Sequence, residues 1–114
     1  MSDEHGKILE TVMGMIMHGG DAKSSSLEAI QAAKSGDFEG AIDLIESAEE
    51  ALIKAQKSHS KLLTKEASED DVELSLLMIH GQDHLMNAIT TKDLAIEFID
   101  VYRKFDGQDV SGED

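Results

Sequence analysis

The sequence predicts an all-α fold of three long antiparallel helices, and three observations lead to this prediction. The chain of 114 residues contains no proline, so no residue type forces a break in a helix. Only four of its residues are aromatic, which is few for the core of a small β-sandwich. Apolar residues recur three and four positions apart through three long segments, and this is the period of an amphipathic helix.

The first helix is expected over residues 3–34, because Ser35-Gly36 is a usual helix terminator. Two adjacent glycines, Gly19 and Gly20, destabilise a helix by on the order of 1 kcal/mol each relative to alanine. They indicate either close packing at this point or room left for another group. The apolar seam of this helix is rich in small residues, which let a neighbouring helix approach closely: Ile8, Val12, Met15, Gly19, Ala22, Ser26, Ala29 and Ala33.

The second helix is expected to begin after Asp37, a favourable N-cap residue, and to continue to about residue 65. His59 occupies a position expected in the core, and we interpret it as a packing histidine. A contribution of His59 or Gln56 to a site on a neighbouring helix stays open. The seam of this helix is continuous: Phe38, Ala41, Ile45, Ala48, Leu52, Ala55, His59 and Leu62.

The third helix is expected to begin after Ser68, with acidic residues 69–71 in its first turn, and to end near Lys104. A hairpin within the chain buries only one apolar stripe, so a second stripe predicts another partner and therefore a helical oligomer. The first stripe comprises Leu74, Met78, Leu85, Ile89 and Ile96. The second comprises Val72, Leu76, Ile79, Asp83, Met86 and Thr90.

One domain is expected over residues 1–105, followed by an acidic, disordered tail at 106–114. The net charge of −14 disfavours nucleic acid and anionic membrane surfaces as partners. No cysteine is present, which excludes disulfides and thiol chemistry, and no apolar run reaches the roughly 20 residues of a membrane span. The acidic N-terminus is unlike a signal peptide, so we expect a cytoplasmic protein without direct membrane insertion.

Asp83 is the one charged residue in the second stripe of the third helix. Self-association would bring several copies of this carboxylate together, and like charges at close range need a proton or a cation. Carboxylate oxygens suit a hard divalent metal ion, so a metal at the symmetry axis is one interpretation. The alternative is an aspartate that caps a backbone group or faces solvent at a gap in the packing.

His80 and His84 are one helical turn apart and share a face that borders the Asp83 stripe. A zinc hydrolase motif would have glutamate directly after the first histidine, whereas Gly81 stands there and would leave one flank of the imidazole open. An accessible imidazole can act as a nucleophile toward a phosphoryl group, and the bond that it forms is labile enough for onward transfer. The alternative is that both histidines are ordinary surface residues.

The stretch His80-Gly81-Gln82-Asp83-His84-Leu85-Met86 resembles the signature of the lactose/cellobiose family of enzyme IIA components of the bacterial sugar phosphotransferase system. Further segments resemble the same family: Gly20-Asp21-Ala22-Lys23-Ser24, Gly36-Asp37-Phe38 and Leu62-Leu63 with Glu66-Ala67. The order and spacing of these segments hold from about residue 8 to residue 104.

This resemblance implies a homotrimer with a nine-helix core and a phosphotransferase activity of the phosphohistidine-carrier type. His80 would accept a phosphoryl group from phospho-HPr and pass it to a cysteine of the cognate enzyme IIB, during uptake of a lactose-, cellobiose- or chitobiose-type sugar. Asp83 would hold a divalent cation, expected to be Mg²⁺, on the trimer axis, and Gln82 and His84 would have supporting roles.

The second helix departs from the family pattern. The family often has Ala-His here, followed shortly by Gln-Thr, whereas this chain has Ala55-Gln56-Lys57-Ser58-His59-Ser60. The departure puts in doubt any site role for this segment. It also leaves an alternative function open, a non-transferring metal-binding or regulatory module on the same scaffold.

Overall fold

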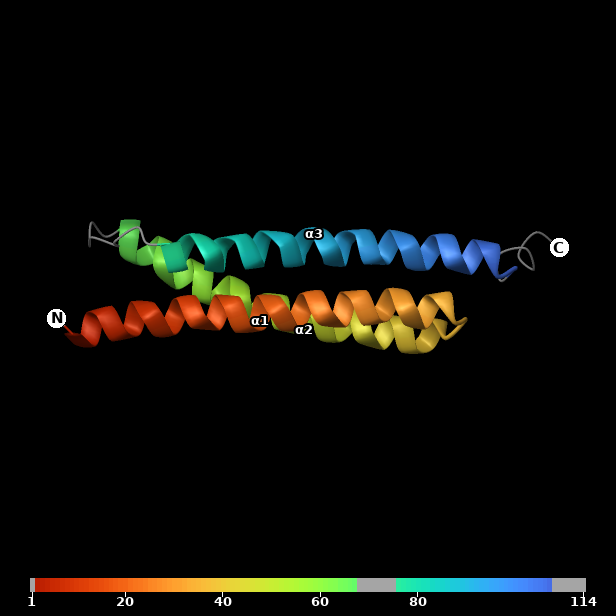
Figure 1. Ribbon diagram of the computed structural model, residues 1–114, viewed down its shortest axis with the longest axis horizontal. Helices are drawn as coiled ribbons and strands as arrows, with labels where there is room; N and C mark the ends of the chain where they lie inside the picture. Colours follow the sequence, from red (N-terminus) through yellow and green to blue (C-terminus); the bar gives the residue numbers. More distant parts are fainter. Residues whose placement is uncertain (1, 68–75, 108–114) are drawn as a thin grey trace.

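The computed structural model describes residues 2–67 and 76–107, and within these ranges the chain forms three helices and no strand. Helix α1 spans Ser2–Lys34, α2 spans Phe38–Ala67 and α3 spans Leu76–Phe105. The helices form a long bundle in which α1 and α3 run in the same direction and α2 runs back (Figure 1). The predicted all-α class with three long antiparallel helices is confirmed.

The core lies along α1, which packs against both α2 and α3, whereas α2 and α3 contact each other less. Every member of the two seams predicted for α1 and α2 is buried or half-buried. Met15 of α1 and Leu85 of α3 are the largest side chains with almost no exposure among the described residues. The small residues of α1, including Ala22 and Ala29, allow both neighbours to approach it closely.

The junction of α1 and α2 follows the local chemistry that the sequence predicts. Gly36 adopts a φ of 88°, its N–H donates to the Ala33 carbonyl at 3.0 Å, and the Asp37 N–H donates to the Ala32 carbonyl at 2.9 Å. This pair of bonds is a Schellman motif, which ends a helix and favours glycine at the left-handed position. The Asp37 Oδ1 atom then accepts the Gly40 N–H at 2.9 Å, so Asp37 is the N-cap of α2 as predicted.

The buried face of α3 differs in part from the predicted stripe. Met78 and Leu85 are buried and Ile89 is half-buried, but Ile96 is 39% exposed. Much of the buried face consists of small residues that the prediction left out: Gly81, Ala88 and Ala95. They suit a helix that packs closely on α1. Ser68, residues 69–71, Val72 and Leu74 lie outside the described residues, so the predicted start of this helix is untested.

Helix α3 ends at Phe105 and is followed by a turn, in which Gly107 has a φ of 83° and its N–H donates to the Lys104 carbonyl at 3.3 Å. Residues 108–114 lie outside the described ranges, so the predicted tail at 106–114 stays a prediction. No helix within residues 2–67 and 76–107 combines the length and apolar character that a membrane crossing requires.

Candidate functional site

His80 and His84 lie one turn apart near the start of α3, and their rings are in contact. The ring centroids are 4.4 Å apart and the ring planes meet at 86°, an edge-to-face arrangement. His80 is exposed and His84 is half-buried. The predicted shared face is thus confirmed. The half-buried His84 ring touches one side of the His80 ring, and the His80 ring stays accessible to solvent.

Two glycines bring α1 and α3 together directly beneath this histidine pair. A Cβ atom on Gly19 would lie 3.3 Å from the carbonyl carbon and oxygen of His84, so the backbones approach closely at this point. A Cβ atom on Gly81 would lie 3.1 Å from Cγ1 of Val12. Of the two alternatives left open for the Gly19-Gly20 pair, close packing holds for Gly19.

Gly81 has a different role from the one predicted. It was expected to leave a flank of the His80 ring open, but it is buried and faces α1. Its small size therefore serves helix packing. The consequence for His80 is indirect, because the close contact fixes the part of α3 that bears the ring.

His80 also borders an apolar hollow at the start of α3. The described residues that line this hollow are Leu76, Leu77, Ile79, His80 and Asp83. Leu76 is 83% exposed and Ile79 is 51% exposed. An exposed imidazole beside exposed apolar side chains is suited to meeting a protein partner, since exposed apolar surface commonly marks a site of protein contact.

Asp83 is exposed on the second stripe of α3, and its backbone carbonyl accepts a hydrogen bond from Nδ2 of Asn87 at 2.9 Å. Gln82 is also exposed, but at about 200° around the helix it does not face His80 within the chain. Gln56 is exposed and His59 is half-buried, so His59 sits at the edge of the core and not inside it.

The second stripe is exposed at each of its described positions, and it continues beyond the predicted limit at Thr90. We name these residues the assembly stripe: Leu76, Ile79, Asp83, Met86, Thr90, Leu94, Phe98, Val101 and Phe105. The spacing of three and four over nine positions is the pattern of a helix that packs against other helices. Sequence reasoning missed the last four residues, although the same spacing would have found them.

A metal ion would need donors from more than one chain. Among the residues that the structure describes, no three histidine, cysteine, aspartate or glutamate side chains gather closely enough to hold an ion. Asp83 provides a single carboxylate per chain, exposed in an apolar stripe. That donor fits a hard cation such as Mg²⁺ if copies of the stripe meet.

Comparison with known proteins places this arrangement in a family. The profile of the lactose/cellobiose-specific IIA subunits of the phosphotransferase system matches residues 10–103. The chain belongs to this family. The lichenan-specific phosphotransferase enzyme IIA component of Bacillus subtilis (strain 168) is 46% identical over 99 residues, which cover 87% of this chain and 90% of that protein.

Solved structures agree with this membership. The crystal structure of the cellobiose-specific enzyme IIA from Bacillus anthracis superposes with a TM-score of 0.86 at 41% identity, over 88% of this chain and 92% of that one. The IIA(Chitobiose) structure in complex with HPr, from the Escherichia coli phosphotransferase system, superposes with a TM-score of 0.76 at 33% identity, over 87% and 96% of the two chains. The protein is therefore a IIA component of a sugar phosphotransferase system, with a role in phosphoryl transfer.

Proposed function

We propose that His80 is the residue that carries the phosphoryl group, with phospho-HPr as donor and a cysteine of enzyme IIB as acceptor. An unprotonated imidazole nitrogen of His80 attacks phosphorus, and the bond between phosphorus and the donor atom of HPr breaks with its electron pair leaving on HPr. The cysteine thiolate of IIB then attacks the same phosphorus. The nitrogen–phosphorus bond breaks and neutral His80 is restored.

The observation that carries this proposal is an exposed imidazole in edge-to-face contact with a second ring, on a part of α3 that packs closely against α1. A carrier needs a nucleophile that two successive partners can reach, and it needs no enclosed substrate cavity. The apolar hollow beside His80 supplies contact area for those partners. A relative of this chain is known in complex with HPr, which supports HPr as the donor.

His84 and Gln82 have supporting roles in this proposal. His84 restricts rotation of the His80 ring, so the attacking nitrogen is presented in fewer orientations. Gln82 points away from His80 within its own chain, so its contribution depends on a neighbouring copy or on the partner.

Labelling with phosphoenolpyruvate tests the proposal. In the presence of enzyme I and HPr, we expect the wild-type protein to take up label and His80→Ala to take up none. His18→Ala is the matched control, because His18 is also a helical histidine that is not fully buried, and it should label normally. His84→Ala should label more slowly than wild type. A folded wild-type protein that acquires no label would instead favour a non-transferring metal-binding or regulatory module.

The assembly stripe supports a homotrimer in which copies of α3 pack together along the axis. Nine exposed positions along one helix, most of them apolar, would otherwise remain in water. Asp83 carboxylates from the copies would meet near the axis, and a divalent cation such as Mg²⁺ would offset their repulsion. In this role the ion would supply charge balance for assembly and would take no part in the chemistry at His80.

Asp83→Leu tests the assembly and the metal together. We expect a folded trimer that has lost its bound metal and is at least as stable, because an apolar seam replaces a buried carboxylate cluster. Asp43→Leu is the control, because Asp43 is an exposed aspartate of α2 outside the assembly stripe, and this variant should keep the metal. Sedimentation gives the mass and elemental analysis gives the metal content. A wild-type protein that sediments as a monomer would contradict the trimer.

A further inference from the structure

Lys57 and Lys61 of α2 are unusual cations in a strongly acidic chain. Both are exposed, and they belong to residues 51–65, a stretch with four lysines and no acidic residue in a chain of net charge −14. Among the residues that the structure describes, neither lysine makes an ion pair. Lys57 also lies in the segment of α2 that departs from the family pattern. The transfer steps proposed above give these two lysines no role.

Both lysines line an open hollow on the outer side of α2. At about 100° per residue, Lys57 lies roughly opposite the buried side chains of Ala55 and Leu62. Apart from Ile53, every described residue that lines the hollow has a side chain that donates hydrogen bonds. We name these residues the donor face of α2: Gln56, Lys57, Ser60, Lys61 and Thr64. Such a set of donors suits an anion with several oxygen atoms, for example a phosphoryl group.

His80 lacks such donors in the hollow beside it. The other described residues that line this hollow are Asp83, whose carboxylate repels an anion, and three apolar residues. A phosphoryl group carries about two negative charges at neutral pH. Catalysis of its transfer depends mainly on positioning and on cations that balance this charge. A cation that balances the charge at His80 is therefore expected from another chain.

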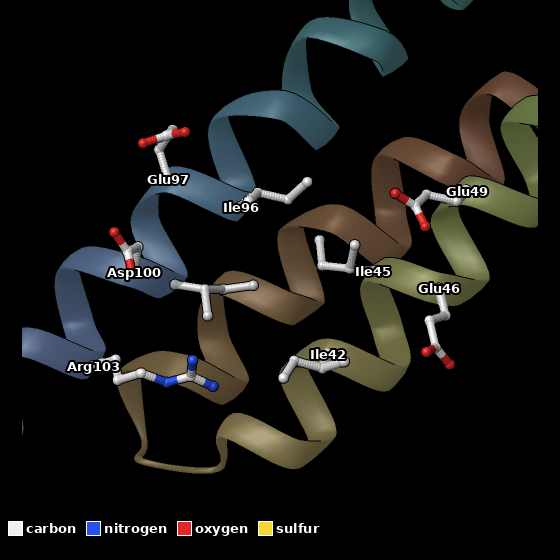
Figure 2. Close-up of a pocket in the computed structure, with 9 residues that line it drawn as sticks. Ile42, Ile45, Glu46, Glu49, Ile96, Glu97, Asp100 and Arg103 are labelled. Atoms are coloured by element: carbon white, nitrogen blue, oxygen red, sulfur yellow. The ribbon is translucent and has the colours of Figure 1, made fainter. Parts of the chain in front are cut away.

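The side of α3 that faces α2 is marked by the groove between these two helices, which Asp100 and Arg103 line (Figure 2). At about 100° per residue, these two residues lie about 140–200° around α3 from His80. On the same scale, Asp83 and Val101 of the assembly stripe lie at about 300°. His80 and α2 therefore lie on opposite sides of the assembly stripe.

In the proposed trimer, the assembly stripes of three copies meet at the axis. Rotation about a three-fold axis places one flank of each copy against the opposite flank of the next copy. The flank that bears His80 therefore faces the flank of the next copy that bears α2.

Contacts within the chain show that His80 is level with the second half of α2. Gly81, the neighbour of His80, lies against Val12 of α1. Gly14, two positions further along α1, lies against Ser58 of α2, where an added Cβ atom would be 3.1 Å from the Ser58 Oγ atom. Because α2 runs opposite to α1 and α3, Ser58 is within about 5 Å of the level of His80 along the bundle.

We infer that Lys57 and Lys61 of one copy contact the phosphoryl group that His80 of the next copy carries. The two lysines lie within one helical turn of Ser58, and therefore near the level of His80, and rotation about the axis leaves that level unchanged. Their ammonium groups donate hydrogen bonds to the phosphoryl oxygens and balance the negative charge, and no covalent bond to lysine forms. The inference rests on the proposed trimer and on His80 as the carrier. It makes each transfer site complete only between two copies.

Mixed trimers test the inference, because they place the lysines and the histidine on different chains. The variant with Lys57→Gln and Lys61→Gln should take label from phospho-HPr about tenfold or more slowly than wild type, since cations that stabilise the phosphoryl group in transfer are lost. His80→Ala should take none. The two variants, with different affinity tags, are expressed together, and trimers that carry both tags are isolated. Each mixed trimer has one site where an intact His80 faces intact lysines, and that site should label at the wild-type rate.

Two control variants separate the role of these lysines from general charge. Lys34→Gln with Lys104→Gln removes the same charge from exposed positions of α1 and α3 and should label at the wild-type rate. Lys57→Arg with Lys61→Arg keeps both cations and should retain most of the rate. The rate is measured at saturating HPr, because weaker docking of HPr would raise KM and leave the maximal rate unchanged.

Three results would overturn the inference: a lysine variant that labels as fast as wild type, mixed trimers that stay as slow as that variant alone, or a rise only in KM for HPr. If the double substitution prevented assembly, which sedimentation would show, Lys61→Gln alone carries the same prediction. A wild-type protein that takes up no label is a separate result, since it would refute His80 as the carrier and not the placement of the lysines.

Discussion

The contact between Gly19 and the backbone of His84 predicts opposite effects for two adjacent glycine-to-alanine substitutions. An alanine Cβ at position 19 would lie 3.3 Å from the His84 carbonyl carbon and oxygen, whereas one at position 20 would have no atom within 4 Å. Both substitutions gain about 1 kcal/mol of helix propensity. Overpacking at position 19 destabilises by about 1–3 kcal/mol because the obstacle is backbone and cannot rotate away. Gly20→Ala should therefore stabilise the protein by about 1 kcal/mol, and Gly19→Ala should leave it unchanged or destabilise it by up to about 2 kcal/mol.

Urea unfolding followed by circular dichroism measures both free energies. The variants are compared at one protein concentration, since the stability of an oligomer depends on concentration. The rate of His80 labelling is the second measurement. Gly19→Ala should slow labelling, because a displaced His84 backbone changes the ring contact that orients His80, and Gly20→Ala should not. Equal stabilisation by both substitutions, with equal labelling rates, would refute a rigid contact at Gly19.

Three further predictions concern the helix junction and the core. Asp37→Ala should lower the free energy of unfolding by about 1 kcal/mol and Asp37→Asn by much less, because the lost interaction is the hydrogen bond from Gly40 to the side chain; urea titration measures both. Gly36→Ala should destabilise by about 1 kcal/mol, since its φ of 88° is unfavourable for a residue with a Cβ atom, whereas Gly6→Ala in α1 should not. Leu85→Ala should lower the free energy of unfolding by about 2–5 kcal/mol, because Leu85 is 1% exposed; a loss below about 1 kcal/mol would mean that the core relaxes around the cavity.

The fold could be predicted from the sequence where a helix buries its apolar face within its own chain. The seams of α1 and α2 satisfy that condition, and each of their members is buried or half-buried. The boundary between α1 and α2 could also be predicted, because Ser35-Gly36-Asp37 combines a helix terminator with an N-cap in three residues. For α3 the condition fails, since much of its apolar surface faces outward. The predicted stripe contained only large apolar side chains and therefore included Ile96. The buried face of α3 also contains the small residues Gly81, Ala88 and Ala95.

The candidate site was predictable only to the extent that it lies on one helix. The i and i+4 spacing of His80 and His84 is enough to place both rings on one face, and the structure adds their edge-to-face contact. The support beneath them comes from Gly19 and Val12 on α1, some 60 residues earlier in the chain. No sequence spacing shows which turn of one helix meets which turn of another. The sequence shows that Gly19 and Gly20 destabilise a helix. Only the structure shows that Gly19 is needed because it lies against the backbone of His84.

The arrangement of α3 separates the surface that packs within the chain from the surface that the proposed partners can reach. Its buried face packs on α1, and its exposed surface carries His80 and the assembly stripe. In the proposed transfer, donor and acceptor use the same histidine in turn, so those two partners would compete at His80.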